Sequence, residues 1–194
     1  MLSERLQLKL YLEPSPHFEL EPLVPVFHRF IRERALEELM IDVVDYSHVP
    51  DGPGVVLIGH AADYYVGALD GAYGLVYSRK RGGPEPEARL EDAFCRLINA
   101  ARLLEQEPGL TLRFRSNELC LRLTDRLRAP NDDASFENSQ AEVAALFGRV
   151  YGSEVKTARL LGDKEPLGLR ITAPVSPTLE ALLEKLGGPP TTPS

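Results

Sequence analysis

The sequence predicts an α+β protein in which helices pack on one face of a largely antiparallel sheet. Short segments in which apolar and polar residues alternate predict strands, and most of these segments come in pairs joined by a short turn. Longer segments with apolar residues three and four positions apart predict helices with one apolar stripe. Neither kind of segment buries its apolar side alone, so we expect helices and strands to cover each other.

The first strand is expected over residues 6–12, where every second residue is leucine. Gln7, Lys9 and Tyr11 lie between the leucines, so this strand is expected to bury one face only. A helix is expected next, over residues 21–36. Its stripe consists of apolar residues at helical spacing, namely Leu23, Val26, Phe27, Phe30 and Ile31.

The middle of the chain is expected to hold further strands. Residues 39–44 are rich in β-branched side chains, and residues 55–58 are apolar at every position, which is typical of a strand covered on both faces. Residues 64–69 and 74–81 are expected to form a hairpin. The pair Asp70-Gly71 between them favours the tight turn that such hairpins use.

The rest of the chain repeats the order of a helix followed by a hairpin. The expected elements are a helix at 86–106, a hairpin of 110–115 with 119–125, a helix at 136–151, a hairpin of 154–161 with 167–173, and a short helix that ends at 186. Because no linker separates these helix-hairpin units, residues 1–186 are predicted to form a single α+β domain. Residues 187–194 contain no core-forming side chain and are predicted to be a disordered tail rich in proline and threonine.

Charge and cysteine content restrict the class of protein. The 194 residues carry a formal net charge of −7, which argues against nucleic-acid binding because that function needs a cationic surface. Cys95 and Cys120 are not at a metal-binding spacing, so we expect no metal and no cofactor. No apolar segment approaches the roughly 20 residues that span a bilayer, and the N-terminal segment lacks the apolar core of a secretion signal. We therefore expect a cytoplasmic protein without membrane contact.

The strongest candidate for a ligand site follows the apolar segment at residues 55–58. A histidine titrates near neutral pH, tyrosines stack or donate hydrogen bonds, and a basic run binds a carboxylate or a phosphate. The candidate ligand-binding residues are His60, Tyr64, Tyr65, Tyr77, Arg79, Lys80 and Arg81. In the alternative interpretation these residues are structural: the histidine ends a strand, the tyrosines fill a sheet surface and the basic run is solvated.

Three functions are compatible with the sequence, and no motif assigns a catalytic residue. The first hypothesis is a cytoplasmic, non-catalytic binding or assembly domain with a protein partner or as a homo-oligomer, because hairpin units leave sheet edges to be covered. The alternative is an enzyme or sensor for a small anionic ligand that uses His60 and the Arg79–Arg81 cluster. The second alternative is a nucleic-acid accessory protein that uses the arginine-rich face of the hairpin at 110–125.

Overall fold

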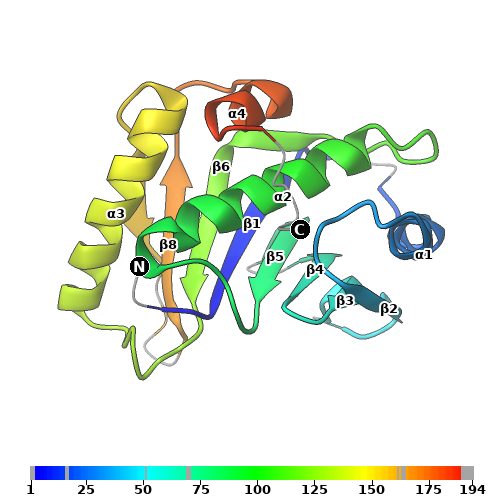
Figure 1. Cartoon of the computed structure of the whole chain (residues 1–194), viewed down its shortest axis with the longest axis horizontal. Helices are drawn as coiled ribbons and strands as arrows, with labels where there is room; N and C mark the ends of the chain where they lie inside the picture. Colours follow the sequence, from blue (N-terminus) through cyan, green and yellow to red (C-terminus); the bar gives the residue numbers. More distant parts are fainter. Residues whose placement is uncertain are drawn as a thin grey trace.

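The computed structural model describes residues 3–15, 18–50, 52–68, 71–160, 162 and 165–188. Within them the chain forms an eight-stranded sheet and four α-helices (Figure 1), which confirms the predicted α+β class. The strands are β1 (Leu6–Leu12), β2 (Met40–Tyr46), β3 (Gly54–Gly59), β4 (Ala62–Gly67), β5 (Gly74–Arg79), β6 (Phe114–Leu123), β7 (Lys156–Arg159) and β8 (Leu167–Thr172). The helices are α1 (Leu23–Glu33), α2 (Arg89–Glu105), α3 (Asp133–Tyr151) and α4 (Leu179–Lys185).

The sheet is antiparallel between every pair of neighbours. Its strands lie in the order β2-β3-β4-β5-β1-β6-β8-β7. The first strand of the chain therefore lies inside the sheet, between β5 and β6. Leu6, Leu8 and Leu10 are completely buried there on one side of β1, as the alternation predicts. The expectation that β1 buries one face only is wrong, because Lys9 and Tyr11 on the other side are buried as well in the interior of the sheet.

One face of the sheet lines the main apolar core, and we call it the inner face. A row of paired residues crosses this face: Leu57, Tyr64, Tyr77, Leu8, Leu121 and Leu169. Buried side chains of all four helices, among them Phe27 of α1 and Phe147 of α3, belong to the same apolar cluster as this row. In Figure 1, α2 crosses in front of the central strands, while α3 and α4 lie towards the β8 side of the sheet. Helix α1 contacts β2 and β3 at the opposite end.

The other face of the sheet, which we call the outer face, has a different chemistry. Its central row is Val56, Tyr65, Val76, Lys9, Cys120 and Arg170. The first three of these residues form a separate small apolar cluster with Ile58. Lys9 Nζ and the Arg170 guanidinium lie 4.6 Å and 5.3 Å from the centroid of the Tyr11 ring. The outer face therefore combines apolar, aromatic and cationic side chains.

Two of the three predicted hairpins are confirmed. β4 pairs with β5, and β7 pairs with β8, as the alternation in each segment predicts. Asp70 of the predicted turn and residues 189–194 of the predicted tail lie outside the described residues. None of the helices in the described part of the chain is long and apolar enough to cross a membrane.

The hairpin predicted at 110–125 is wrong, because β6 is one continuous strand. The polar residues 116–118 suggest a turn in the sequence, but residues 115–118 form a bulge opposite the single residue Tyr11 of β1. Backbone carbonyls in this bulge accept hydrogen bonds from the Tyr151 hydroxyl and from the Ala173 N–H. The bulge thus satisfies its polar groups without reversing the chain. As a result, the regular repeat of helix-hairpin units is not observed.

Candidate functional site

The ligand-binding residues predicted from the sequence do not lie in one place. Because side chains alternate along a strand, β4 and β5 send them to both faces of the sheet. Those on the inner face are Tyr64, Tyr77 and Arg79. Tyr65 lies on the outer face. The residues that follow the ends of β3 and β5 are His60, Lys80 and Arg81.

The two inner tyrosines are fixed parts of the core. Their ring centroids are 5.1 Å apart. The Tyr64 hydroxyl donates to the Glu38 carboxylate at 2.9 Å, and the Tyr77 hydroxyl accepts a hydrogen bond from Arg79 Nε at 3.2 Å. Burial raises the pKa of Tyr64 well above its ordinary value and raises the pKa of Tyr77 to about 12. Both hydroxyls therefore stay protonated at neutral pH.

Arg79 is bound by the protein itself. Its side chain is 2% exposed and pairs through Nη2 with the carboxylate of Asp92 on α2. Its Nη1 donates to the backbone carbonyl of Arg89 at 3.1 Å. The guanidinium thus joins β5 to the first turn of α2, and little of it is left for a ligand.

Arg79 is linked through Asp92 to three further charged residues, and sequence reasoning did not select these four partners. Together with Arg79 they form what we call the buried ionic cluster: Glu37, Glu38, Arg79, Asp92 and Arg96. Arg96 lies 3.0 Å from Asp92, 3.1 Å from Glu38 and 3.4 Å from Glu37. Burial raises the pKa of Glu37, whose carboxylate oxygens have no hydrogen-bond partner in the described part of the chain. The spacing of Asp92 and Arg96 was the only signal in the sequence, and many solvated helix pairs share it.

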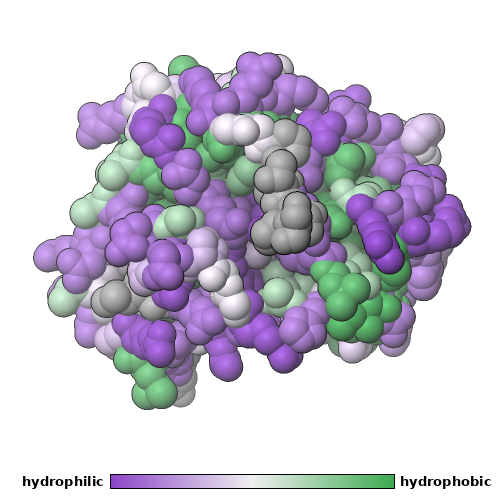
Figure 2. All heavy atoms as spheres, viewed as in Figure 1, coloured by the Kyte–Doolittle hydropathy of each residue, from purple (hydrophilic) through white to green (hydrophobic). Residues whose placement is uncertain are grey.

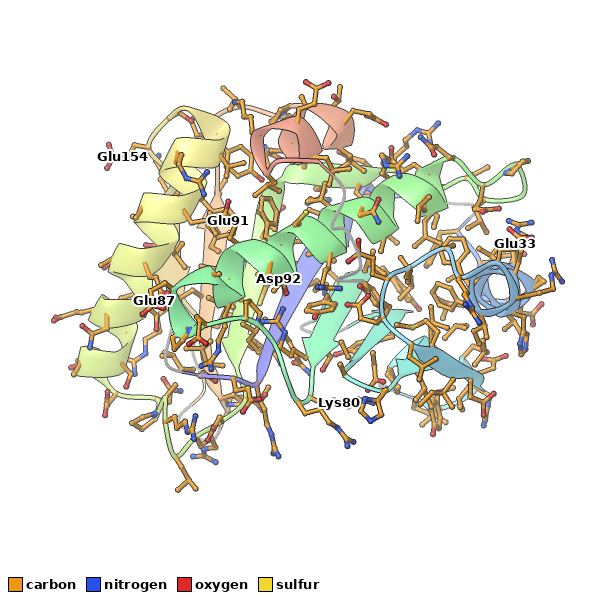
Figure 3. The ribbon with its side chains drawn as sticks, viewed as in Figure 1. Glu33, Lys80, Glu87, Glu91, Asp92 and Glu154 are labelled. Atoms are coloured by element: carbon orange, nitrogen blue, oxygen red, sulfur yellow. The ribbon has the colours of Figure 1, made fainter. Side chains whose placement is uncertain are left out.

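Lys80 is tied to the neighbouring strand ends. Its Nζ donates to the Gly59 carbonyl and to the Asp63 carboxylate, each at 2.7 Å. The His60 side chain is exposed, and the backbone N–H of His60 donates to the Leu39 carbonyl at 2.9 Å. In Figure 3, Lys80 lies at the lower rim of the sheet, and Asp92 lies on α2 near the centre of the view. The basic run 79–81 is therefore divided between the core and the rim.

An open groove of about 600 Å³ lies at this rim. It is formed where β1 begins and where β5 and β6 end. We call it the basic groove, and its lining residues are Arg5, Gln7, Ser78, Arg79, Lys80, Arg81 and Thr124. All of these residues are polar or cationic, and no carboxylate is among them. His60 is not one of the lining residues, so the groove combines only part of the predicted site with residues of β1 and β6 that the sequence did not single out.

A smaller hollow of about 480 Å³ lies at the opposite end of β1. Phe18 and Tyr73 line it with their ring centroids 5.1 Å apart, and Arg115 contributes to its wall. The Arg115 guanidinium is held by Glu118 at 2.9 Å and lies 3.7 Å from Glu13, which also lines the hollow. Because these carboxylates offset its charge, this hollow is poorly suited to an anion.

The strand at one edge of the sheet exposes large apolar side chains. We call this region the β2 edge and define it by Leu39, Ile41, Tyr46 and Val49 together with the strand backbone. Figure 2 shows apolar atoms gathered at the lower right, where Figure 1 places β2 and β3. The Val43 N–H donates to the carboxylate of its neighbour Asp42 at 2.8 Å, so this N–H is directed away from β3.

The two cysteines are separated by the sheet. Cys95 of α2 belongs to the main core, whereas Cys120 of β6 lies in the outer row, and neither cysteine forms a disulfide. Burial raises the pKa of the Cys95 thiol to about 11. Among the described residues, no group of three or more histidine, cysteine, aspartate and glutamate side chains is arranged to hold a metal ion.

Comparison of the chain with protein-family models, with curated proteins and with solved structures found no significant match. What the molecule does must therefore be inferred from its own geometry. Two features are candidates for a function, namely the basic groove and the β2 edge. The buried ionic cluster stabilises the contact between the sheet and α2.

Proposed function

We propose that this protein is a non-catalytic assembly domain in which two copies pair through their β2 strands. The observation that carries this proposal is the β2 edge, where Leu39 is 71% exposed and Ile41 is 58% exposed. A strand at the edge of a sheet presents unpaired N–H and C=O groups that another strand can bind. Covering apolar side chains beside such groups adds a favourable hydrophobic contribution.

The opposite edge of the sheet supports this choice by contrast. β7 has four residues, Lys-Thr-Ala-Arg, with no large apolar side chain. Gln140 of α3 donates to Thr157 of β7 at 2.6 Å, so a helix lies beside this edge. Short, charged and covered edges resist pairing with other strands. β2 has seven residues, and it exposes large apolar side chains although it carries two aspartates, a register shift between Met40 and Asp42 and a contact with α1.

A second copy of the chain fits the sequence of β2. In an antiparallel pair about a two-fold axis at Val43, Asp42 lies opposite Val44 of the other copy, and Ile41 lies opposite Asp45. No two carboxylates then oppose each other. Centring the axis on Asp42 or on Asp45 would instead place two identical carboxylates opposite each other, which like-charge repulsion disfavours. A symmetric pair is therefore expected to be centred on Val43 or on Val44.

The surroundings of β2 carry both signs of charge. Arg32 and Arg34, at the end of α1, are exposed, and α1 contacts β2. Asp42 and Asp45 are exposed on the strand itself. A surface with both signs of charge can be complementary to a second copy of itself, whereas a purely basic partner would be repelled by the arginines. On pairing, the outward N–H of Val43 exchanges the Asp42 carboxylate for a carbonyl of the second strand.

The proposal includes two finer expectations from the sequence. One is that the helices cover a single face of the sheet. It is supported by the apolar cluster on the outer face, Val56, Tyr65 and Val76, because this cluster consists of strand residues and includes no described residue of a helix. The other is a cytoplasmic location, which is supported by the reduced state of Cys95 and Cys120, since neither forms a disulfide.

The decisive experiment is size-exclusion chromatography with light scattering over a series of protein concentrations. We expect the mass of two chains at high concentration and a shift towards one chain on dilution. A single chain at every concentration would contradict the proposal. Larger open assemblies would contradict it as well, because a two-fold pair is closed.

A further inference from the structure

We propose that the basic groove binds a small anion with several phosphate groups, either an inorganic oligophosphate or a multiply phosphorylated polyol. This site is independent of the assembly proposed above, because it lies where β1, β5 and β6 meet and not at β2. The groove volume of about 600 Å³ is within the roughly 300–1,000 Å³ typical of small-molecule sites.

The strand register places three cations around this groove. Leu6 is opposite Arg79, so Arg5 and Lys80, the next residues outward, end neighbouring strands. The Thr124 N–H donates to the Arg5 carbonyl at 3.2 Å, which joins the end of β6 to the same rim. Arg81 follows Lys80. The positive charge therefore comes from three chain segments that the sheet holds in place.

Two of these cations are free to bind a ligand. Arg5 and Arg81 are exposed, and neither forms an ion pair with any residue that the structure describes. Lys80 shares its charge with Asp63 but uses only two of its three N–H donors, on Asp63 and Gly59. The guanidinium of Arg79 is bound to Asp92 and adds no free donor. The net charge facing the groove is thus positive in a chain whose total is −7.

The uncharged lining residues are also suited to an oxyanion. Gln7 Nε2 donates to Ser78 Oγ at 3.3 Å, so the Ser78 hydroxyl hydrogen remains available for a ligand. Thr124 supplies a second hydroxyl. Guanidinium forks together with hydroxyl donors are the groups that bind phosphate oxygens most effectively.

The lining indicates what the rest of the ligand looks like. No apolar or aromatic side chain lines the groove, so nothing is present to hold a nucleobase or an acyl chain. The groove is also larger than one phosphate group. A compact, densely charged anion fits this combination better than a nucleotide or a lipid.

The test is isothermal titration calorimetry of the full chain with tripolyphosphate, inositol hexakisphosphate and inorganic phosphate. We expect at least one of the first two compounds to bind more tightly than phosphate, and the better of them identifies the source of the phosphate groups. Arg81→Glu and Arg5→Glu should each weaken binding by about tenfold or more. Arg113→Glu is the matched control, because it reverses an exposed arginine that precedes β6, at the end of this strand opposite to Thr124.

Two results would overturn the inference. One is that neither tripolyphosphate nor inositol hexakisphosphate binds more tightly than inorganic phosphate. The other is an equal loss in Arg113→Glu and Arg81→Glu, which would show unspecific attraction to arginine. Amide chemical shifts of Gln7, Ser78 and Thr124 in the unmodified protein give a second measurement that does not depend on any variant. They should move on titration, and shifts confined to other residues would place the anion elsewhere.

Discussion

Arg79 of β5 and Asp92 of α2 form an ion pair that joins the sheet to the helix across the core. The arginine side chain is 2% exposed and the aspartate side chain is 23% exposed. Little water therefore reaches the arginine to compensate its charge if its partner is removed. The same pair explains why the run 79–81 is not one site, since its first residue belongs to the core and its other two belong to the rim.

Replacing the partner of this arginine should destabilise the fold strongly. We expect Asp92→Ala to lower the free energy of unfolding by about 3–5 kcal/mol, because it leaves a buried guanidinium without its carboxylate. Urea denaturation followed by circular dichroism measures the change.

The residue before Asp92 provides the matched control. Glu91 also forms an ion pair, with Arg149 at 2.7 Å, but about half of each side chain is exposed to water. Glu91→Ala should lower the free energy of unfolding by less than about 1 kcal/mol. Equal losses in the two variants would mean that burial of Arg79 does not determine the effect.

Assembly through β2 should depend on Ile41. We expect Ile41→Asp to abolish the pair, because in the register centred on Val43 it places a second carboxylate opposite Asp45 of the other copy and removes an apolar contact. Leu127→Asp is the control, since Leu127 is 96% exposed and is not part of the β2 edge. Light scattering should report one chain for the first variant and two chains for the second. A pair that persists in Ile41→Asp would move the interface to another surface.

The buried tyrosines should make the protein sensitive to alkali. Burial raises the pKa of Tyr65 and of Tyr77 from 10.0 to about 12. Above pH 10 the unfolded chain releases protons that the folded chain retains, so the free energy of unfolding should fall as the pH rises from 10 to 12. Below pH 10 this contribution is fully present.

Denaturation midpoints measured across this pH interval test the effect. Tyr77→Phe removes one of the retained protons, so its stability should fall less steeply with pH. Tyr73→Phe, at an exposed position, should behave like the unmodified protein. A stability that is constant from pH 10 to pH 12 would contradict the assigned burial of the hydroxyls.

The Cys95 thiol should be unreactive in the folded protein. Its pKa of about 11 leaves little thiolate near neutral pH, and the thiolate is the reactive form. In a Cys120→Ala variant, modification by a disulfide reagent should be slow without denaturant and fast in urea. Rapid stoichiometric modification of the folded variant would show that Cys95 is accessible.

The elements that the sequence predicted correctly are those whose signals are local. The alternation in residues 64–69 and 74–81 was sufficient to identify β4 and β5, and the leucines at positions 6–12 were sufficient for β1. β6 was misread because its bulge depends on Tyr11, about a hundred positions earlier in the chain. Three polar residues in a row are found both in turns between strands and in bulges within one strand. Which of the two structures forms depends on the pairing with the neighbouring strand.

The candidate site was predicted only in part for a similar reason. Alternation correctly put Tyr77 and Arg79 on one side of β5 and Lys80 on the other. It did not show that the first side faces α2, where Asp92 and Arg96 lie. Nor did it show that Arg5 and Thr124 end strands beside Lys80, because that depends on the order of strands in the sheet.

The central position of β1 has a consequence for how the chain folds during synthesis. Of the eight strands in this sheet β1 is made before the other seven, yet Leu6 pairs with positions 79 and 123. The leucines of β1 therefore remain unpaired while the intervening residues are synthesised, and such non-local pairing slows folding. A nascent chain that ends before β6 carries its most regular apolar strand with one side unpaired, and this is the stage at which the protein is most exposed to aggregation.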